Sequence, residues 1–310
     1  MGAGNPGDDV KRDLLVGVAQ WLASPGEPKQ NLSVALGMAE SAASRGVELL
    51  VLPELWSCGY DPDTLPEDAR RDAEPLHGPR TQQLSDAARR HALFLAAGSV
   101  PERGDDGLLY NTALVFDPAG RLVSWHRKAH LYPPALEQRI FAPGERLTTF
   151  ADAALGTVGL VVGFDGDFPE VARALARRGA RVVLAPSASE VERSTAWELV
   201  HPALALVYGQ WWVQANQAGS HGSSTLLGAS RIIAPTGTVV AAASEALPGR
   251  ASPSELVVHR IDLQLAARRE GLAALVEEGW RPELYADAAA LAGRGQELGS
   301  VVPSTMPASP

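Results

Sequence analysis

The sequence is poor in cysteine, in long apolar runs and in clustered basic residues. One cysteine, Cys58, stands among 310 residues, so no disulfide can form within the chain. The apolar runs are too short to cross a bilayer as helices. The N-terminal residues contain no cationic region followed by a long apolar stretch and a cleavage site. We therefore expect a cytoplasmic protein that has no membrane partner.

Basic residues are outnumbered by acidic ones. The chain has 36 Asp and Glu against 27 Lys and Arg, and its formal net charge is -9. No block of Lys and Arg is interleaved with aromatic residues, so we expect no nucleic acid partner. His126 and His130 follow a predicted strand without the cysteines or carboxylate cluster of a metal site. We expect neither a metal nor another cofactor.

The chain does contain a regular alternation of predicted strands and helices. Apolar, β-branched runs predict strands, and apolar residues at helical spacing predict helices. The predicted strands are 14–21, 47–54, 93–100, 157–162, 181–189 and 210–219, with turn-linked pairs over 111–128 and 229–244; the predicted helices are 31–46, 81–91, 169–179 and 195–209. Two similar halves follow from this order. Two facing mixed sheets with helices outside would satisfy it better than one doubly wound sheet.

The domain organisation is expected to be simple. With 45% hydrophobic residues the chain can bury a large core, and no Gly/Ser/Pro-rich linker divides its middle. We predict one domain over residues 11–290. Residues 1–10 are predicted to be a flexible N-terminus, and residues 291–310 a tail.

Three charged residues stand at or just beyond the ends of predicted strands. Glu54 closes the segment LLVLPE, Lys128 closes LVSWHRK, and Glu137 follows in YPPALEQRIFAPG. A carboxylate or an ammonium group at the end of an apolar strand is costly unless it is paired, so the three groups favour a shared site. Taken singly, each of them could also be a solvated loop charge.

Seven segments in the right order, along almost the whole chain, resemble the nitrilase superfamily, also called the carbon-nitrogen hydrolases. They are LLVLPELWSCGYDP, NTALVFDPAGRLVSWHRKAHL, EQRIFAPGE, VGLVVGFDGDFPE, QANQAG, GASRIIAPTG and RPELY. The resemblance implies an α/β fold, a four-layer αββα sandwich, and assembly as a homodimer or a higher homo-oligomer. It also implies that Glu54 is a general base, that Lys128 stabilises a tetrahedral intermediate, and that Glu137 orients the substrate and the lysine.

The chain departs from that superfamily where the nucleophile should stand. Members typically read Cys-Tyr-Asp, then a short turn and Phe-Pro-Glu, whereas this chain reads Gly163-Phe164-Asp165 before its Phe-Pro-Glu. The turn that often carries an arginine is Gly166-Asp167 here. A glycine offers no atom for a covalent intermediate, so ordinary thiol-dependent amidase or nitrilase turnover is not expected. The resemblance therefore implies a divergent member without the catalytic cysteine.

Two classes of function remain open at this point. In the first, an enzyme acts at a carbon-nitrogen centre of a small molecule through Glu54, Lys128 and Glu137, with the backbone N–H of Phe164 at the developing negative charge. Hydration, elimination, cyclisation and condensation all fit such a site. In the second, the chain is an inactive pseudoenzyme that binds a small molecule or a partner protein, and the charged trio survives as a buried network.

Three further side chains are weighed as candidates for the same site. Tyr60 and Tyr132 flank the presumed acid-base groups and are predicted to bind substrate, although either could simply pack. Cys58 lies four positions after Glu54 and is the only side chain that could supply a substitute thiol. A packing cysteine is the preferred interpretation of Cys58.

Overall fold

The computed structural model describes residues 13–135, 137–222, 224–247, 254–268 and 270–285. The expected flexible N-terminus, residues 1–10, and the expected tail, residues 291–310, lie outside the described residues. Within the described ranges, no helix is long and apolar enough to cross a membrane.

The first six-stranded sheet is built mainly from the N-terminal half of the chain. Its strands have the order β14-β1-β2-β3-β4-β5. Strands β1, β2 and β3 are parallel, and the strands on either side of them pair antiparallel. The bounds are β1 Asp13–Gln20, β2 Leu49–Val51, β3 Phe94–Arg103, β4 Leu109–Phe116, β5 Leu122–Arg127 and β14 Glu255–Asp262.

The second sheet repeats this arrangement with the C-terminal half. Its order is β13-β12-β9-β8-β7-β6, and the central strands β7, β8 and β9 are parallel. The bounds are β6 Thr148–Asp152, β7 Gly156–Leu160, β8 Val182–Ser187, β9 Trp211–Asn216, β12 Arg231–Ile233 and β13 Val239–Ala242. A separate hairpin is formed by β10 Ala218–His221 and β11 Ser224–Leu227. The two similar halves predicted from the sequence are present.

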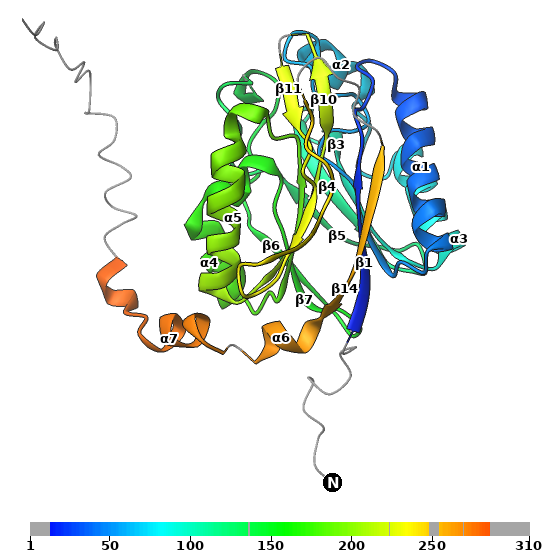
Figure 1. The fold of residues 1–310 in the computed structure, drawn as a ribbon. Coiled ribbons are helices and arrows are strands. Elements are labelled where there is room, and N and C mark those ends of the chain that lie inside the picture. The colour runs from blue at the N-terminus through cyan, green and yellow to red at the C-terminus, as the bar shows by residue number, and fades with distance from the viewer. Residues whose placement is uncertain (1–12, 136, 223, 248–253, 269, 286–310) are drawn as a thin grey trace, which may run out of the picture.

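Helices cover the outer faces of both sheets, as Figure 1 shows. On one side lie α1 Pro28–Ser44 and α3 Pro79–His91, and on the other α4 Pro169–Arg177 and α5 Ser194–Tyr208. The shorter helices are α2 Leu65–Asp72, α6 Leu263–Ala267 and α7 Leu272–Glu278; the 3-10 helices are Glu137–Arg139, Gly163–Asp167, Val191–Arg193 and Pro282–Tyr285. The four-layer αββα sandwich is therefore confirmed.

Hydrophobic side chains fill three layers: one between the two sheets, one between the first sheet and helices α1 and α3, and one between the second sheet and helices α4 and α5. Val51 of β2, Val158 of β7 and Val213 of β9 lie in the layer between the sheets. The residue next to Val51, Leu50, points the other way and packs against α1 and α3. Because each central strand is covered on both faces, it needs apolar residues at consecutive positions, and this is why the sequence shows continuous apolar runs rather than alternation.

The predicted elements include the edge strands β5 and β13 but miss the edge strands β6 and β14, and they overextend one central strand. β6 and β14 are partly exposed, so their sequences carry no strong pattern. The predicted strand 47–54 forms a ladder only over Leu49–Val51, and Leu55 takes a positive φ of 47°. Glu54 thus stands in a loop beyond the strand. This loop brings its side chain between the two sheets' ends.

Candidate active site

The charged trio comes from three loops of the first half. Glu54 follows β2, and its backbone N–H donates to the carbonyl of Ser187, 3.2 Å away, at the end of β8. Lys128 comes directly after β5, and Glu137 opens the 3-10 helix Glu137–Arg139. The three side chains are at most 2% exposed.

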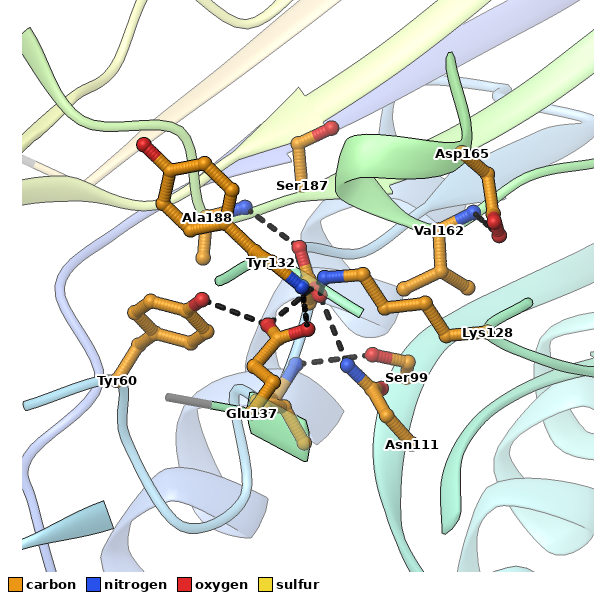
Figure 2. Close-up of polar contacts among 12 residues, drawn as sticks. Tyr60, Ser99, Asn111, Lys128, Tyr132, Glu137, Val162, Asp165, Ser187 and Ala188 are labelled. Atoms are coloured by element: carbon orange, nitrogen blue, oxygen red, sulfur yellow. Dashed lines mark hydrogen bonds and ion pairs between the residues drawn. The ribbon is translucent and has the colours of Figure 1, made fainter. Parts of the chain in front are cut away.

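The structure brings these three side chains into direct contact. The Lys128 Nζ donates to Oε1 of Glu54 at 2.7 Å and to Oε1 of Glu137 at 2.8 Å. Figure 2 shows Lys128, Glu137 and Tyr60 pointing toward one another. One ammonium group thus joins two carboxylates that lie 83 residues apart in the sequence. The geometry excludes the interpretation of each group as a separate solvated loop charge.

Further donors hold each carboxylate in a fixed orientation. Asn111 Nδ2 donates to Oε1 of Glu54 at 2.8 Å, and the Ala188 N–H donates to its Oε2 at 3.0 Å. The hydroxyl of Tyr60 donates to Oε1 of Glu137 at 2.7 Å. The backbone N–H of Tyr132 donates to Oε2 of the same carboxylate at 2.8 Å. Neither Asn111 nor Ala188 was predicted as a site residue, although Asn111 opens the segment NTALVFDPAGRLVSWHRKAHL that carries the resemblance.

Burial and charge shift the protonation of the trio in different ways. Burial raises the pKa of Glu54, and the nearby charge of Glu137 raises it further, while Lys128 opposes both. For Lys128, burial alone would favour the neutral amine, but the two carboxylates outweigh it and raise its pKa above the ordinary value. Lys128 therefore stays an ammonium group, and Glu54 holds a proton more readily than an exposed carboxyl group.

The turn that carries Gly163 lies against Glu54. It follows β7 as the 3-10 helix Gly163–Asp167 and leads into α4, whose first residue is Pro169. Gly163 has a φ of +47°, and a Cβ built on it would lie 2.3 Å from Oε2 of Glu54. The space that a side chain would need at the apex of this turn is filled by a carboxylate. Both the backbone conformation and this contact favour glycine.

Asp165 locks the same turn to the end of β5. Its carboxylate accepts the backbone N–H groups of Val162, Ala129 and His130 at 3.1, 3.1 and 2.8 Å. His126 Nε2 lies 3.0 Å from Oδ2 of Asp165, and His130 Nδ1 lies 2.8 Å from Oδ1. Although burial opposes ionisation, these contacts lower the pKa of Asp165 well below its ordinary value. His126 and His130 thus hold a carboxylate that fixes the turn carrying Gly163, which lies beside Glu54.

The predicted aromatic residues occupy two environments. Tyr60 is 2% exposed and contacts Glu137, so it belongs to the buried network. Tyr132 is only partly buried, and its ring meets that of Phe164 edge to face, with 5.3 Å between centroids. Phe164 in turn packs against Phe168, with 5.1 Å between their centroids. Tyr132 and Phe164 form a partly exposed aromatic pair directly beside Gly163.

Cys58 is a packing residue in this structure. It is 1% exposed and lies in a hydrophobic cluster that includes Leu55, Tyr60 and Leu65. Its thiol is 3.3 Å from the carbonyl oxygen of Gly59. Burial raises the pKa of the Cys58 thiol well above its ordinary value, and the nearby Asp72 adds to the effect. These properties are the opposite of those of a reactive thiolate.

Comparison with known proteins gives consistent matches. Residues 15–269 match the sequence model of the carbon-nitrogen hydrolase family. The chain is 33% identical over 259 residues to omega-amidase NIT2-A of Xenopus laevis, with 81% of this chain and 89% of that one covered. It is also 33% identical over 286 residues to the deaminated glutathione amidase of Bos taurus, with 87% and 83% covered.

Solved structures of an amidase also match the fold of the chain. A double mutant of the amidase from Nesterenkonia sp. AN1, in complex with acrylamide, aligns with a TM-score of 0.74 and 25% identity, covering 90% of this chain and 98% of that one. Another structure of that amidase shows the acetamide moiety of fluoroacetamide added covalently at its active site cysteine.

Proposed function

The chain belongs to the carbon-nitrogen hydrolase family, and from this we propose that it hydrolyses the carbon-nitrogen bond of a small amide with water, rather than a thiol, as the nucleophile. The observation that carries the proposal is the position of Glu54. Its Oε2 occupies the space that a side chain on Gly163 would need. A base is thus present at the position from which a nucleophile attacks.

The reaction begins with a proton transfer to Glu54. Its Oε2 accepts a proton from water while the water oxygen forms a bond to the carbonyl carbon of the amide. The electron pair of the C=O double bond moves to the carbonyl oxygen. Glu54 then returns the proton to the amide nitrogen. The electron pair on the carbonyl oxygen re-forms the C=O bond while the C–N bond breaks with its electron pair going to nitrogen, and the products are ammonia and a carboxylic acid.

Two groups stabilise the negative charge on the carbonyl oxygen. Lys128 retains its ammonium charge between two carboxylates, and the backbone N–H of Phe164 follows Gly163 directly. Glu137 holds Lys128 in place and is itself held by Tyr60. Burial raises the pKa of Glu54, which suits a group that both accepts and returns a proton.

The family relatives support an amide as the substrate class. Two of them are named amidases, and the Nesterenkonia amidase was crystallised with an amide. That amidase reacts through an active site cysteine. Here the 3-10 turn that follows β7 begins with Gly163, and Cys58 is buried in a hydrophobic cluster, so we assign the attack to water.

A second candidate function is that of a pseudoenzyme that binds a ligand without converting it. The observation that favours it is that the charges of Glu54, Lys128 and Glu137 are paired with one another inside the protein. Replacing one member of such a network would destabilise the fold even in a protein without catalytic activity, because the remaining buried charge would lose its partner.

Release of ammonia from a panel of small amides separates the two candidates. We expect turnover by the native protein and a loss of at least about 100-fold in both Glu54→Gln and Lys128→Met. Cys58→Ala is the control and should retain the native rate. Ligand binding without ammonia release across the panel would favour the pseudoenzyme, and equal turnover in Glu54→Gln would exclude the mechanism.

A further inference from the structure

The 3-10 helix Val191–Arg193 lies beside the partly exposed aromatic pair. It follows Ala188, whose N–H donates to Glu54. The guanidinium carbon of Arg193 lies 5.0 Å from the centroid of the Tyr132 ring and 5.3 Å from that of the Phe164 ring. Its side chain is 15% exposed. Arg193 therefore lies beside the aromatic pair that adjoins Gly163.

A chain of hydrogen bonds fixes the partner of Arg193. The guanidinium forms an ion pair with Oδ2 of Asp167, the last residue of the turn that begins at Gly163. Oδ1 of Asp167 lies 3.0 Å from His201 Nε2. His201 Nδ1 lies 2.7 Å from Gln214 Nε2. Oε1 of Gln214 accepts from Arg231 Nε at 2.9 Å.

The donors and acceptors of this chain have one consistent direction. Arginine can only donate, so Gln214 must accept with its oxygen and donate with its nitrogen to Nδ1 of His201. His201 then carries its proton on Nε2 and donates to Asp167. Burial, together with the charges of Arg231 and Arg193, lowers the pKa of His201 to about 3. The imidazole is neutral, its tautomer is fixed, and Asp167 is an oriented carboxylate.

The arrangement leaves donor groups of Arg193 for a ligand. A guanidinium group has five N–H donors in one plane. Among the described residues, the side chain of Arg193 contacts Asp167 and the two ring faces. We propose that Arg193 is the specificity-determining residue of the site and binds a hydrogen-bond-accepting oxygen, a carboxylate or a ketone, on the substrate end remote from the C–N bond.

Asp167 and His201 are then positioning residues that act through Arg193. An arginine side chain has many rotamers. Because Arg193 is held against two rings and paired with a fixed carboxylate, it loses less conformational entropy when the substrate binds. This inference rests on the proposed function only in placing the substrate's C–N bond beside Gly163. Its test is binding, which does not require turnover.

Three amides of similar length serve as probes. Succinamate carries a carboxylate, 4-oxopentanamide carries a neutral ketone, and pentanamide carries no oxygen at its remote end. Dissociation constants are measured by calorimetry with the full-length protein, and the Glu54→Gln variant replaces it for any probe that is converted. We expect one or both oxygen-bearing probes to bind at least about tenfold more tightly than pentanamide, since charge-assisted hydrogen bonds are strong. A preference for succinamate alone would identify a carboxylate, and an equal preference for the ketone a neutral acceptor.

Variants assign this preference to Arg193. Arg193→Met should abolish the preference for the oxygen-bearing probes over pentanamide, and Asp167→Asn should reduce it. If Asp167 acts through Arg193, the double variant will bind each of the three probes with the same affinity as Arg193→Met alone. Asp167→Glu, which keeps the charge, should recover part of the preference. Arg177→Met is the matched control, because Arg177 is an exposed arginine paired with Glu277.

Several results would overturn the inference. They are equal binding of the three probes, no binding of any probe at millimolar concentration, or an undiminished preference in Arg193→Met. If Arg193→Met does not fold, Arg193→Lys replaces it, because a lysine keeps the charge but loses the planar set of donors. If the protein discriminates among the three probes but releases no ammonia from any amide, this inference stands and the proposed function is wrong. Turnover without discrimination would show the reverse.

Discussion

Glu54 and Gly163 share one small volume: a Cβ built on Gly163 would lie 2.3 Å from Oε2 of Glu54. The carboxylate cannot easily yield, because Lys128, Asn111 and the Ala188 N–H all hold it. The glycine therefore leaves room for a carboxylate whose position is fixed. This relation links the glycine at position 163 to the local packing.

Gly163→Ala should lower the free energy of unfolding by about 1–3 kcal/mol, because the residue must keep a positive φ and displace a bound carboxylate. Gly37→Ala is the control. Gly37 lies within α1 with nothing within 4 Å of a built Cβ, so alanine should raise the stability by up to about 1 kcal/mol. Urea denaturation of both variants measures the difference. Equal effects would show that the Glu54 contact carries no strain.

Gly163→Cys should create a thiol that reacts readily with iodoacetamide, since the Lys128 ammonium favours a thiolate. Turnover of simple amides should stay well below that of a cysteine-dependent amidase. The new side chain has to move Glu54 away from its donors. Mass spectrometry after alkylation measures the first effect and ammonia release the second. Full amidase activity in this variant would show that only the nucleophile was lost.

Cys58 should be inert in the native protein. It is 1% exposed, and burial raises its pKa well above the ordinary value. We expect no reaction with a thiol reagent such as Ellman's reagent until urea unfolds the chain, and one equivalent of reaction thereafter. Thiol-sensitive turnover that disappears in Cys58→Ala would contradict this assignment.

The stability should decrease as the pH falls below about 6.5. His201 has a pKa of about 3 in the folded protein, whereas an exposed histidine has one near 6.5. Between these values the unfolded chain binds one more proton, so this residue's contribution is complete above about pH 6.5 and is lost on acidification, at up to about 1.4 kcal/mol per pH unit. Denaturation at pH 7 and pH 5 measures the loss, which should be smaller in His201→Gln. The same replacement at the exposed His77 is the control.

Tyr60→Phe should reduce turnover moderately and lower the free energy of unfolding by about 1 kcal/mol. The change removes the 2.7 Å hydrogen bond to Glu137 without altering the shape of the ring. Glu137 keeps the Lys128 ammonium and the Tyr132 N–H. A rate unchanged within error would show that Tyr60 only packs.

The sequence by itself determined the order of strands and helices, the two similar halves and the glycine at position 163. These features are local: the central strands are covered on both faces and so need continuous apolar runs, and α4 begins at a proline suited to a first turn. The sequence also placed Glu54 and Lys128 near strand ends, where a charge needs a partner. It did not predict β6 and β14, since partly exposed strands carry a weak apolar pattern.

Only the tertiary structure decided how the charged groups meet. Glu54 and Lys128 are 74 residues apart, and their 2.7 Å contact exists because β2 and β5 end at the same edge of one sheet. The role of His126 and His130 could not be predicted from the sequence either, because their partner Asp165 belongs to the turn after β7 in the other sheet. Sequence periodicity reports which face of an element is buried, whereas the packing of two sheets determines which polar groups are buried together. That packing fixed Glu54 against Gly163.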